Sequence, residues 1–476
     1  ADSTKTLDVD GGTIKLDGNY PVGSNNVALG NESLNGSISG SENVAVGTYS
    51  LDATTSGSYN SGLGYAALSG NTTGGANTAI GNGALISSTT GSYNTGLGAS
   101  ALLNNTTASD NTAVGYQAGR SNTTGSPITA IGRKALYTNT TGADNTALGR
   151  NSLFYNTTGG DNTSSGNEAM QANTTGSYNT AYGSDSLRAN TTAAANTAVG
   201  YQALTTNTTG GDNAAFGYQA AQSNTTGDYL TAIGRQALYN NTTADNNTAV
   251  GYKAAYSTTT GAYNTAFGYQ TLLDNTTGYS NAAFAADAMG NNTTGFDNTA
   301  LGNASLYTNT TGSYNVALGR AALQNNTTAS QNTAVGYRAL FTNSTGGNNV
   351  ALGTYALDLN TTGASNTALG YLALSANTTG TLNVSVGKDS MDSNTTGSSN
   401  VALGVDALQS NTIASNNTAV GYQAGYTNTT GVSSTFIGRK AGYATTTGTQ
   451  NLFVGADAGF DNTTGSGNTY VGRGFN

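Results

Sequence analysis

Tyrosine and arginine recur at one fixed place along this chain of 476 residues, directly after a regularly spaced glycine. Tyrosine rings stack on sugar rings, and nearby asparagine, glutamine and aspartate side chains hydrogen-bond sugar hydroxyls. These rows predict a surface ladder that binds glycans, the alternative being that tyrosine only covers its neighbours on a strand. The tyrosines at this place are Tyr65, Tyr116, Tyr201, Tyr218, Tyr252, Tyr269, Tyr337, Tyr371 and Tyr422, and the arginines are Arg133, Arg150, Arg235, Arg320, Arg439 and Arg473.

Carboxylates offer a second kind of chemistry. Aspartate recurs less regularly at another place, as Asp110, Asp144, Asp161, Asp212 and Asp297, and the G-G-x-G-x-D motif of calcium-binding coils is absent. We therefore expect no metal site. The chain has 24 acidic residues, which leaves glycoside hydrolysis by a carboxylate pair as an alternative, although no pair is singled out.

The composition excludes several classes of protein. With no histidine and no cysteine, the chain has no Ser-His-Asp or Cys-His nucleophile, no thiolate or imidazole zinc site and no disulfide. A net charge of −9 opposes binding to nucleic acid. No apolar run is long enough to insert into a membrane. We expect a protein that is not an enzyme and has no cofactor.

These residues are positioned by a strict internal repeat. The glycine returns every 17 residues in 27 copies, interrupted once by Ala285. Examples are Gly30, Gly47, Gly115, Gly217 and Gly472. The unit reads N-T-A-V-G-Y-Q-A-L-x-x-N-T-T-G-x-x, and we number it from 1 at its first asparagine to 17. Because no insertion occurs in any unit, each unit must stack directly on the preceding one.

The unit predicts one coil of a parallel β-solenoid. Asparagine, threonine and glycine disfavour helix, and 17 residues are too few for a helix pair. Two short segments, N-T-A-V-G and Q-A-L, are expected to be strands separated by turns. We therefore predict an all-β solenoid of 27 coils over residues 26–476, on the order of 130 Å long at about 4.8 Å per coil.

The strand predicts self-association. Position 4 is apolar, as in Leu29, Val46, Ile80 and Phe216, with Ser165 as the exception, and position 3 is mostly alanine. Adjacent strand residues point to opposite sides. A strand that avoids large polar groups on both sides is buried on both sides. We expect neighbouring copies to cover the outer side in a parallel homotrimer; the alternative is that small residues simply tolerate solvent.

Asparagine opens the strand in 24 units, including Asn111 and Asn247, and a second asparagine opens most N-T-T-G turns. The departures at position 1 are Ile128, Leu230 and Ser434. Asparagines stacked from coil to coil form amide ladders that satisfy buried backbone groups. The alternative is N-glycosylation, because N-T-T fits the acceptor pattern.

The last units exchange large and small residues. Position 3 becomes Phe436, Phe453 and Tyr470, while the leucine at position 9 becomes Gly442 and Gly459. We expect the two positions to share one packing space. Gly119 and Gly425 depart from this pattern, because their units keep alanine at position 3.

The segment NVALGNESLNGSISGSENVAVG, residues 26–47, resembles the head repeats of trimeric autotransporter adhesins. This resemblance implies parallel trimers of left-handed coils that bind molecules of a host surface or matrix. The N-terminal stretch TLDVDGGTIKLDGNYPVG resembles the entry segment of tail-fibre proteins of tailed phages, cyanophages in particular. The two resemblances imply a cell-surface, extracellular or virion location.

Residues 1–25 precede the repeats and are expected to cap the first coil or join a preceding subunit, with a hairpin at D-G-G. The C-terminal VGRGFN ends within a unit without a capping segment, which predicts either a longer fibre or end-to-end docking. We expect a fibre that binds a receptor, with surface glycans as the candidate ligand. The alternatives are a self-assembling filament or sheath and, third, a polysaccharide depolymerase.

Overall fold

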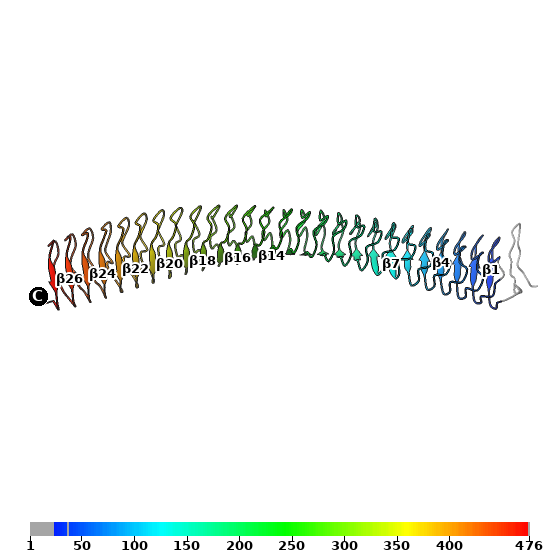
Figure 1. Cartoon of the computed structure of the whole chain (residues 1–476), viewed down its shortest axis with the longest axis horizontal. Coiled ribbons are helices and arrows are strands. Elements are labelled where there is room, and N and C mark those ends of the chain that lie inside the picture. Colours follow the sequence, from blue (N-terminus) through cyan, green and yellow to red (C-terminus); the bar gives the residue numbers. More distant parts are fainter. Residues whose placement is uncertain (1–22, 36–37, 475–476) are drawn as a thin grey trace, which may run out of the picture. The chain divides into compact units, whose positions relative to one another are not determined.

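The computed structural model describes residues 23–35 and 38–474. Its contacts divide the chain into a first unit that ends at Leu230 and a second that begins at Thr231. Within each unit the chain is an all-β parallel solenoid with one strand per 17-residue coil, as the sequence predicts (Figure 1). The expected N-terminal segment, residues 1–25, lies almost entirely outside the described residues.

Every coil contributes one strand, formed in most coils by positions 2 to 4. The first unit contains β1 (Val27–Leu29), β2 (Val44–Val46), β3 (Ser61–Leu63), β4 (Thr78–Ile80), β5 (Thr95–Leu97), β6 (Thr112–Val114), β7 (Ile128–Ile131), β8 (Asn145–Leu148), β9 (Thr163–Ser165), β10 (Thr180–Tyr182), β11 (Thr197–Val199) and β12 (Ala214–Phe216). The second unit contains β13 (Thr231–Ile233), β14 (Thr248–Val250), β15 (Thr265–Phe267), β16 (Ala282–Phe284), β17 (Thr299–Leu301), β18 (Val316–Leu318), β19 (Thr333–Val335), β20 (Val350–Leu352), β21 (Thr367–Leu369), β22 (Val384–Val386), β23 (Val401–Leu403), β24 (Thr418–Val420), β25 (Thr435–Ile437), β26 (Leu452–Val454) and β27 (Thr469–Val471).

Strands of successive coils pair in parallel with a constant register of 17 residues, as in Ala45 opposite Ala28. The amide of the marker glycine extends the pairing, since Gly64 N–H donates to the carbonyl of Val46 at 2.8 Å. Identical positions therefore lie above one another throughout each unit. This stacking turns every feature of the repeat into a column along the solenoid.

The prediction that Q-A-L forms a second strand is wrong. Positions 7 to 9 form a turn in which positions 7 and 9 have positive φ, for example 58° at Gln117 and 49° at Leu136. Residues in the left-handed region cannot continue an extended strand. The amides of this turn still bond to the next coil, since Leu68 N–H donates to the carbonyl of Ala84 at 3.0 Å. The segment therefore stacks between coils without being extended.

The marker glycine occupies a conformation and a space that only glycine fits. Gly115 has φ +133°, and a Cβ built there would lie 2.6 Å from the carbonyl oxygen of Gly132 in the next coil. Gly30, Gly47, Gly217 and Gly472 have similar φ values of 136°, 129°, 139° and 129°. The lapse at Ala285 is accommodated at φ 95°. Close backbone approach between coils explains why this glycine recurs.

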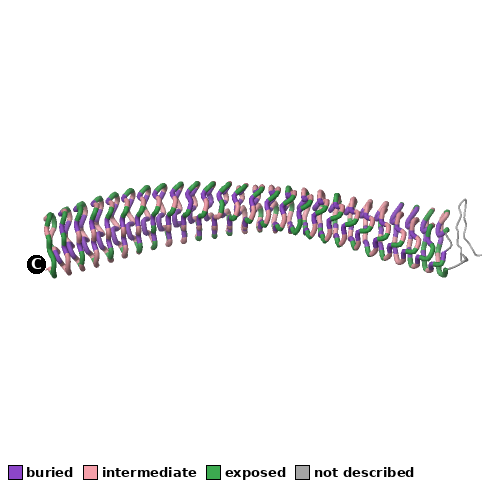
Figure 2. The backbone as a smooth tube through the Cα atoms, in the orientation of Figure 1, coloured by how far each residue is buried: buried purple, intermediate pink, exposed green. Residues whose placement is uncertain are grey.

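The interior of each coil is narrow, and apolar side chains fill one part of it while asparagine side chains fill the other. Alanine at positions 3 and 8 and leucine at position 9 are buried, as are the asparagines at positions 1 and 12 (Figure 2). The buried asparagine side chains are fully hydrogen-bonded wherever asparagine occupies the same position in successive coils. Asn156 Nδ2 donates to Asn139 Oδ1 at 2.7 Å and to the carbonyl of Gly159 at 2.9 Å. The predicted amide ladders are therefore confirmed.

The expected exchange of packing space in the last coils is confirmed. Phe436 and Phe453 are completely buried, and a Cβ at Gly442 would lie 2.3 Å from the Phe436 ring. The departure at Gly425 has the same cause in the neighbouring coil, because a Cβ there would lie 2.7 Å from Phe436. Gly119 similarly accommodates Leu102 and Ile128, whose methyl carbons lie 3.0 and 3.4 Å from its ideal Cβ position.

Breaks in the position-12 column leave buried polar atoms without partners. Serine replaces asparagine at Ser88, and both Ser88 Oγ and the facing Asn71 Oδ1 lack hydrogen bonds. We predict that Ser88→Asn raises the free energy of unfolding by about 1–2 kcal/mol, because it removes the unpaired hydroxyl group and supplies an amide that donates to Asn71 Oδ1. Urea denaturation measures the change. The matched variant Asn156→Ser creates a new break in the column, so it is expected to lower the free energy of unfolding. Equal effects of the two variants on this free energy would contradict the role of the asparagine column.

Candidate functional surfaces

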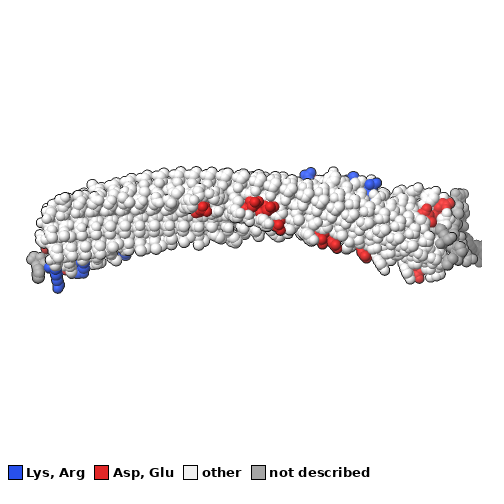
Figure 3. Space-filling model, in the orientation of Figure 1, with Lys and Arg blue, Asp and Glu red and all other residues white. Residues whose placement is uncertain are grey.

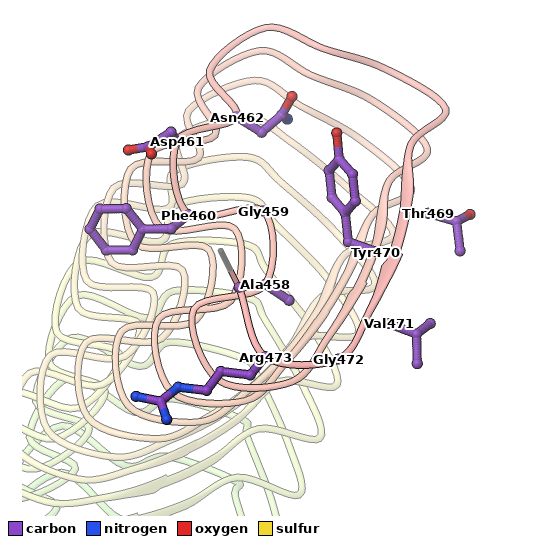
Figure 4. A pocket seen from close by; sticks show the side chains of 11 residues that line it. Ala458, Gly459, Phe460, Asp461, Asn462, Thr469, Tyr470, Val471, Gly472 and Arg473 are labelled. Carbon is purple, nitrogen blue, oxygen red and sulfur yellow. The ribbon is translucent and has the colours of Figure 1, made fainter. Parts of the chain in front are cut away.

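Three surfaces of each coil face outward. The sheet face consists of the side chains at positions 2 and 4, and the aromatic strip consists of those at positions 6, 7 and 10. At the C-terminal end, Thr469 and Val471 point outward from the coil on the sheet side, while Phe460 and Asp461 point outward on the opposite side (Figure 4). Tyr470 and Asn462 point into the coil, and Arg473 lies at the corner after the strand (Figure 4). The third surface is the N-T-T-G loop.

The sheet face is uncharged and exposed in the single chain, with a row of apolar side chains at position 4 beside mainly threonine at position 2. Position 4 carries large hydrophobic residues in nearly every coil, and Leu63, Phe267 and Leu301 expose 49%, 53% and 51% of their surface. Position 2 is threonine, valine, alanine, serine or leucine, and no charged residue occurs at position 2 or 4 in any coil. Charged groups elsewhere are also sparse on the face shown in Figure 3. Contiguous exposed apolar surface of this extent is typical of interaction sites.

The predicted tyrosine ladder at position 6 is exposed but not continuous. Tyr201 stacks on Tyr218 at 5.5 Å between ring centroids, and Tyr252 on Tyr269 at 5.3 Å. In each stacked pair one face of each ring is covered by the other ring, which reduces the ring surface that is open to a ligand. Tyr116 and Tyr422 have no ring neighbour among the described residues, and each exposes about half of its surface.

The other ladder tyrosines pack edge-on against tyrosine at position 7. Tyr65 contacts Tyr49 at 5.9 Å, and Tyr337 and Tyr371 lie on either side of Tyr355 at 5.4 and 6.4 Å. The nine predicted residues therefore fall into stacked, edge-packed and single tyrosines. Their common location is the corner after the strand.

Position 10, which sequence reasoning missed, carries further close aromatic stacks. Tyr239 and Tyr256 stack at 5.0 Å, and Tyr443 stacks on both Tyr426 and Phe460 at 5.1 and 5.0 Å. The signal was present, since tyrosine or phenylalanine occurs at this position in adjacent units. What the sequence did not show is that the turn at positions 7 to 9 brings position 10 beside position 7.

Lysine at position 7 sits over these stacks. Lys253 Nζ lies 5.6 Å from the ring of Tyr252 and 4.9 Å from that of Tyr256. Lys134 lies 5.2 Å from Tyr137, and Lys440 lies 5.1 Å from Tyr443. Each contact joins an ammonium group to the negative face of a ring. The aromatic strip thus combines ring edges, hydroxyl groups and cations.

One cluster of charged side chains in the aromatic strip forms ion pairs within the chain. Arg338 donates to Asp358 at 3.2 Å and lies 4.2 Å from the ring of Phe341. Burial raises the pKa of the Asp358 carboxyl, and the Arg338 charge opposes this rise. Glu168 is paired in the same way with Arg150 and Arg188. These carboxylates are held by arginine, which favours a structural role.

The aspartates before the strand lie exposed at position 17 with φ between 52° and 59°. Aspartate tolerates the left-handed region, so the turn explains its recurrence. Among residues 23–35 and 38–474, no three acidic side chains are grouped so as to hold a metal ion. The same described residues form no helix that is long and apolar enough to cross a membrane.

The asparagine columns occupy the N-T-T sites. Asn111 Oδ1 accepts from Ile128 N–H at 2.8 Å, and Asn247 Oδ1 accepts from Asn264 N–H at 2.8 Å. Ser434 replaces the amide with its hydroxyl, which accepts from Asn451 N–H at 3.2 Å. At position 12, where N-T-T begins, the asparagines are completely buried except for Asn462 near the C-terminal end.

A hollow of about 670 Å³ lies against the last described coil, between Ala458–Asn462 and Thr469–Gly474 (Figure 4). In sequence comparisons, no protein-family model matches the chain, and no curated protein matches it significantly.

We predict that the folded protein is not N-glycosylated at N-T-T. The acceptor Nδ2 atoms, such as that of Asn173, are buried and already donate two hydrogen bonds. Incubation of folded protein with an oligosaccharyltransferase is expected to leave its mass unchanged, whereas protein unfolded in urea and presented as peptides is modified. Modification of folded protein at these sites would contradict the buried ladder.

Proposed function

We propose that this protein is a non-enzymatic fibre protein that assembles from parallel copies of itself, as a trimer, and binds surface glycans through its aromatic strip. The observation that carries the proposal is the uncharged apolar sheet face, which recurs in every coil and is exposed in the single chain. Its resemblance to adhesin heads and phage tail fibres supports an extracellular, cell-surface or virion location.

The size of the sheet face supports self-association. Four residues at about 3.3 Å each and 12 coils at about 4.8 Å give the first unit a face of roughly 750 Å². The 15 coils of the second unit give roughly 940 Å² by the same estimate. A standard protein interface buries about 800 Å² on each partner. A second copy offers an apolar face with the same coil spacing, so its side chains interdigitate in every coil.

The aromatic strip, which begins at the corner after the strand and continues away from the sheet face through positions 7 and 10, supports ligand binding (Figure 4). In the second unit, Lys253 lies over the rings of Tyr252 and Tyr256. Tyr269 stacks on Tyr252, and Tyr239 stacks on Tyr256. Stacking covers one face of each ring and leaves the hydroxyl groups free to approach a ligand, so hydrogen bonding to sugar hydroxyls contributes to binding beside ring stacking. Repetition along the solenoid would multiply a weak affinity.

We predict that Phe267→Asp combined with Leu301→Asp weakens self-association at least tenfold without unfolding the coil. Both side chains point outward, and each aspartate would be desolvated in the apolar contact. Native mass spectrometry and sedimentation equilibrium measure the assembly, with circular dichroism as the folding check. The control is Thr294→Asp with Thr311→Asp on the exposed loop. A wild-type chain that stays monomeric at micromolar concentration would refute the assembly.

We predict that Tyr252→Ala combined with Tyr256→Ala weakens glycan binding about tenfold, since each removes a hydroxyl group and a ring from the strip. A glycan array with surface polysaccharides identifies the ligand, and calorimetry measures the affinity. Tyr314→Ala, an exposed tyrosine before the strand, is the matched control. Absence of binding on the array by the assembled wild type would favour the filament without a ligand.

A further inference from the structure

The two edges of the sheet face carry opposite charges. Position 17, immediately before the strand, holds acidic residues and never lysine or arginine. Position 6, immediately after the marker glycine, holds basic residues and never aspartate or glutamate. Position 7 mixes both signs, as Lys134 and Glu168 illustrate, so the separation is not a property of all surface positions. The acidic edge is Glu42, Asp110, Asp144, Asp161, Asp212 and Asp297, and the basic edge is Arg133, Arg150, Arg235, Arg320, Lys388, Arg439 and Arg473.

The acidic edge is free of ion pairs within the chain. All of its members are exposed, and none has a basic partner within 4.0 Å in the described part of the chain. Some carboxylates elsewhere are paired, since Glu168, Asp185 and Asp358 each lie beside an arginine. Six unpaired acids along one side of an apolar face are therefore available to a partner.

We propose that the acidic edge of one copy lies against the basic edge of the next, and that this contact makes the assembly parallel and cyclic. The inference rests on the self-association under the proposed function. When copies run parallel with their sheet faces toward a common axis, the position-17 edge of each meets the position-6 edge of its neighbour. When two copies run antiparallel face to face, each edge meets the same edge of its partner, so acids oppose acids and bases oppose bases. Charge complementarity therefore selects the parallel arrangement.

The spacing of the charges also fits neighbouring coils. Arginine follows aspartate after 23 residues in Asp110 and Arg133, in Asp212 and Arg235, and in Asp297 and Arg320. This spacing equals one coil plus the six residues that separate position 17 from position 6 of the next unit. With one common offset between copies, each of the three aspartates of one copy therefore lies opposite an arginine of the next. The offset of one coil defines the expected register of the contact.

The test reverses charges on the edges of the full chain. Asp110→Arg with Asp297→Arg makes both edges basic, and Arg133→Asp with Arg320→Asp makes both edges acidic. Each variant is expected to raise the dissociation constant at least about tenfold, because like charges then meet at two of the three contacts. For the chain carrying all four changes, the dissociation constant is expected to return to within about threefold of the wild-type value. Sedimentation equilibrium measures each constant, and rising salt is expected to reduce the differences.

The control is Asp274→Arg with Asp461→Arg, which makes the same change in net charge on the side opposite the sheet face. It is expected to leave association unchanged. Equal weakening by the control, or no recovery in the fourfold variant, would overturn the edge contact. A wild type that never associates refutes the proposed assembly itself, whereas an oligomer insensitive to every reversal refutes only the edge contact. Full recovery on mixing the two double variants supports edge pairing but indicates an even number of copies.

Discussion

Hydrogen bonding between buried asparagines of successive coils is the constraint on which the structure depends. Asn156 is bonded to Asn139 in one direction and to Asn173 in the other, and the same arrangement continues along the column. An amide shifted by one residue would leave these buried groups unpaired, at about 1–3 kcal/mol for each. The columns thus explain why 27 units contain no insertion.

The coil length, the marker glycine and the amide ladders could be predicted from the sequence because each reflects a strict local requirement. Gly115 has no room for a Cβ, and Asn111 must bond the next coil, so substitution is rare at both places. The sequence also held the information that Q-A-L is a turn. Positions 7, 9 and 17 never carry valine, isoleucine or threonine, although threonine is abundant elsewhere. β-Branched residues are disfavoured at positive φ, which is the conformation found there.

The composition of the aromatic strip could not be predicted, because it depends on the path of the turn rather than on any one residue. On an extended strand, Lys253 and Tyr256 would point to opposite sides. The left-handed residues at positions 7 and 9 bend the chain, and the lysine then reaches the rings of both Tyr252 and Tyr256. Stacking between coils adds Tyr239 and Tyr269, which are distant in sequence. Prediction of the nine position-6 tyrosines therefore found one edge of this surface and missed the rest.

Regularity within the chain creates a difficulty for contacts between chains. The sheet face repeats after every coil, so two apolar faces that slide past each other by one coil exchange one set of leucine, isoleucine and valine contacts for a nearly identical set. Burial of apolar area therefore stabilises association without fixing its direction or register. Charged residues beside the sheet do not repeat regularly, since Asp110, Asp144 and Asp161 occupy only some coils. Exposed ion pairs contribute little free energy, about 0.2–1 kcal/mol each, but a mismatch replaces attraction with repulsion at several coils together. In such a molecule the apolar face supplies the affinity, and the sparse, irregular charges at its edges are the only groups that distinguish one alignment from another.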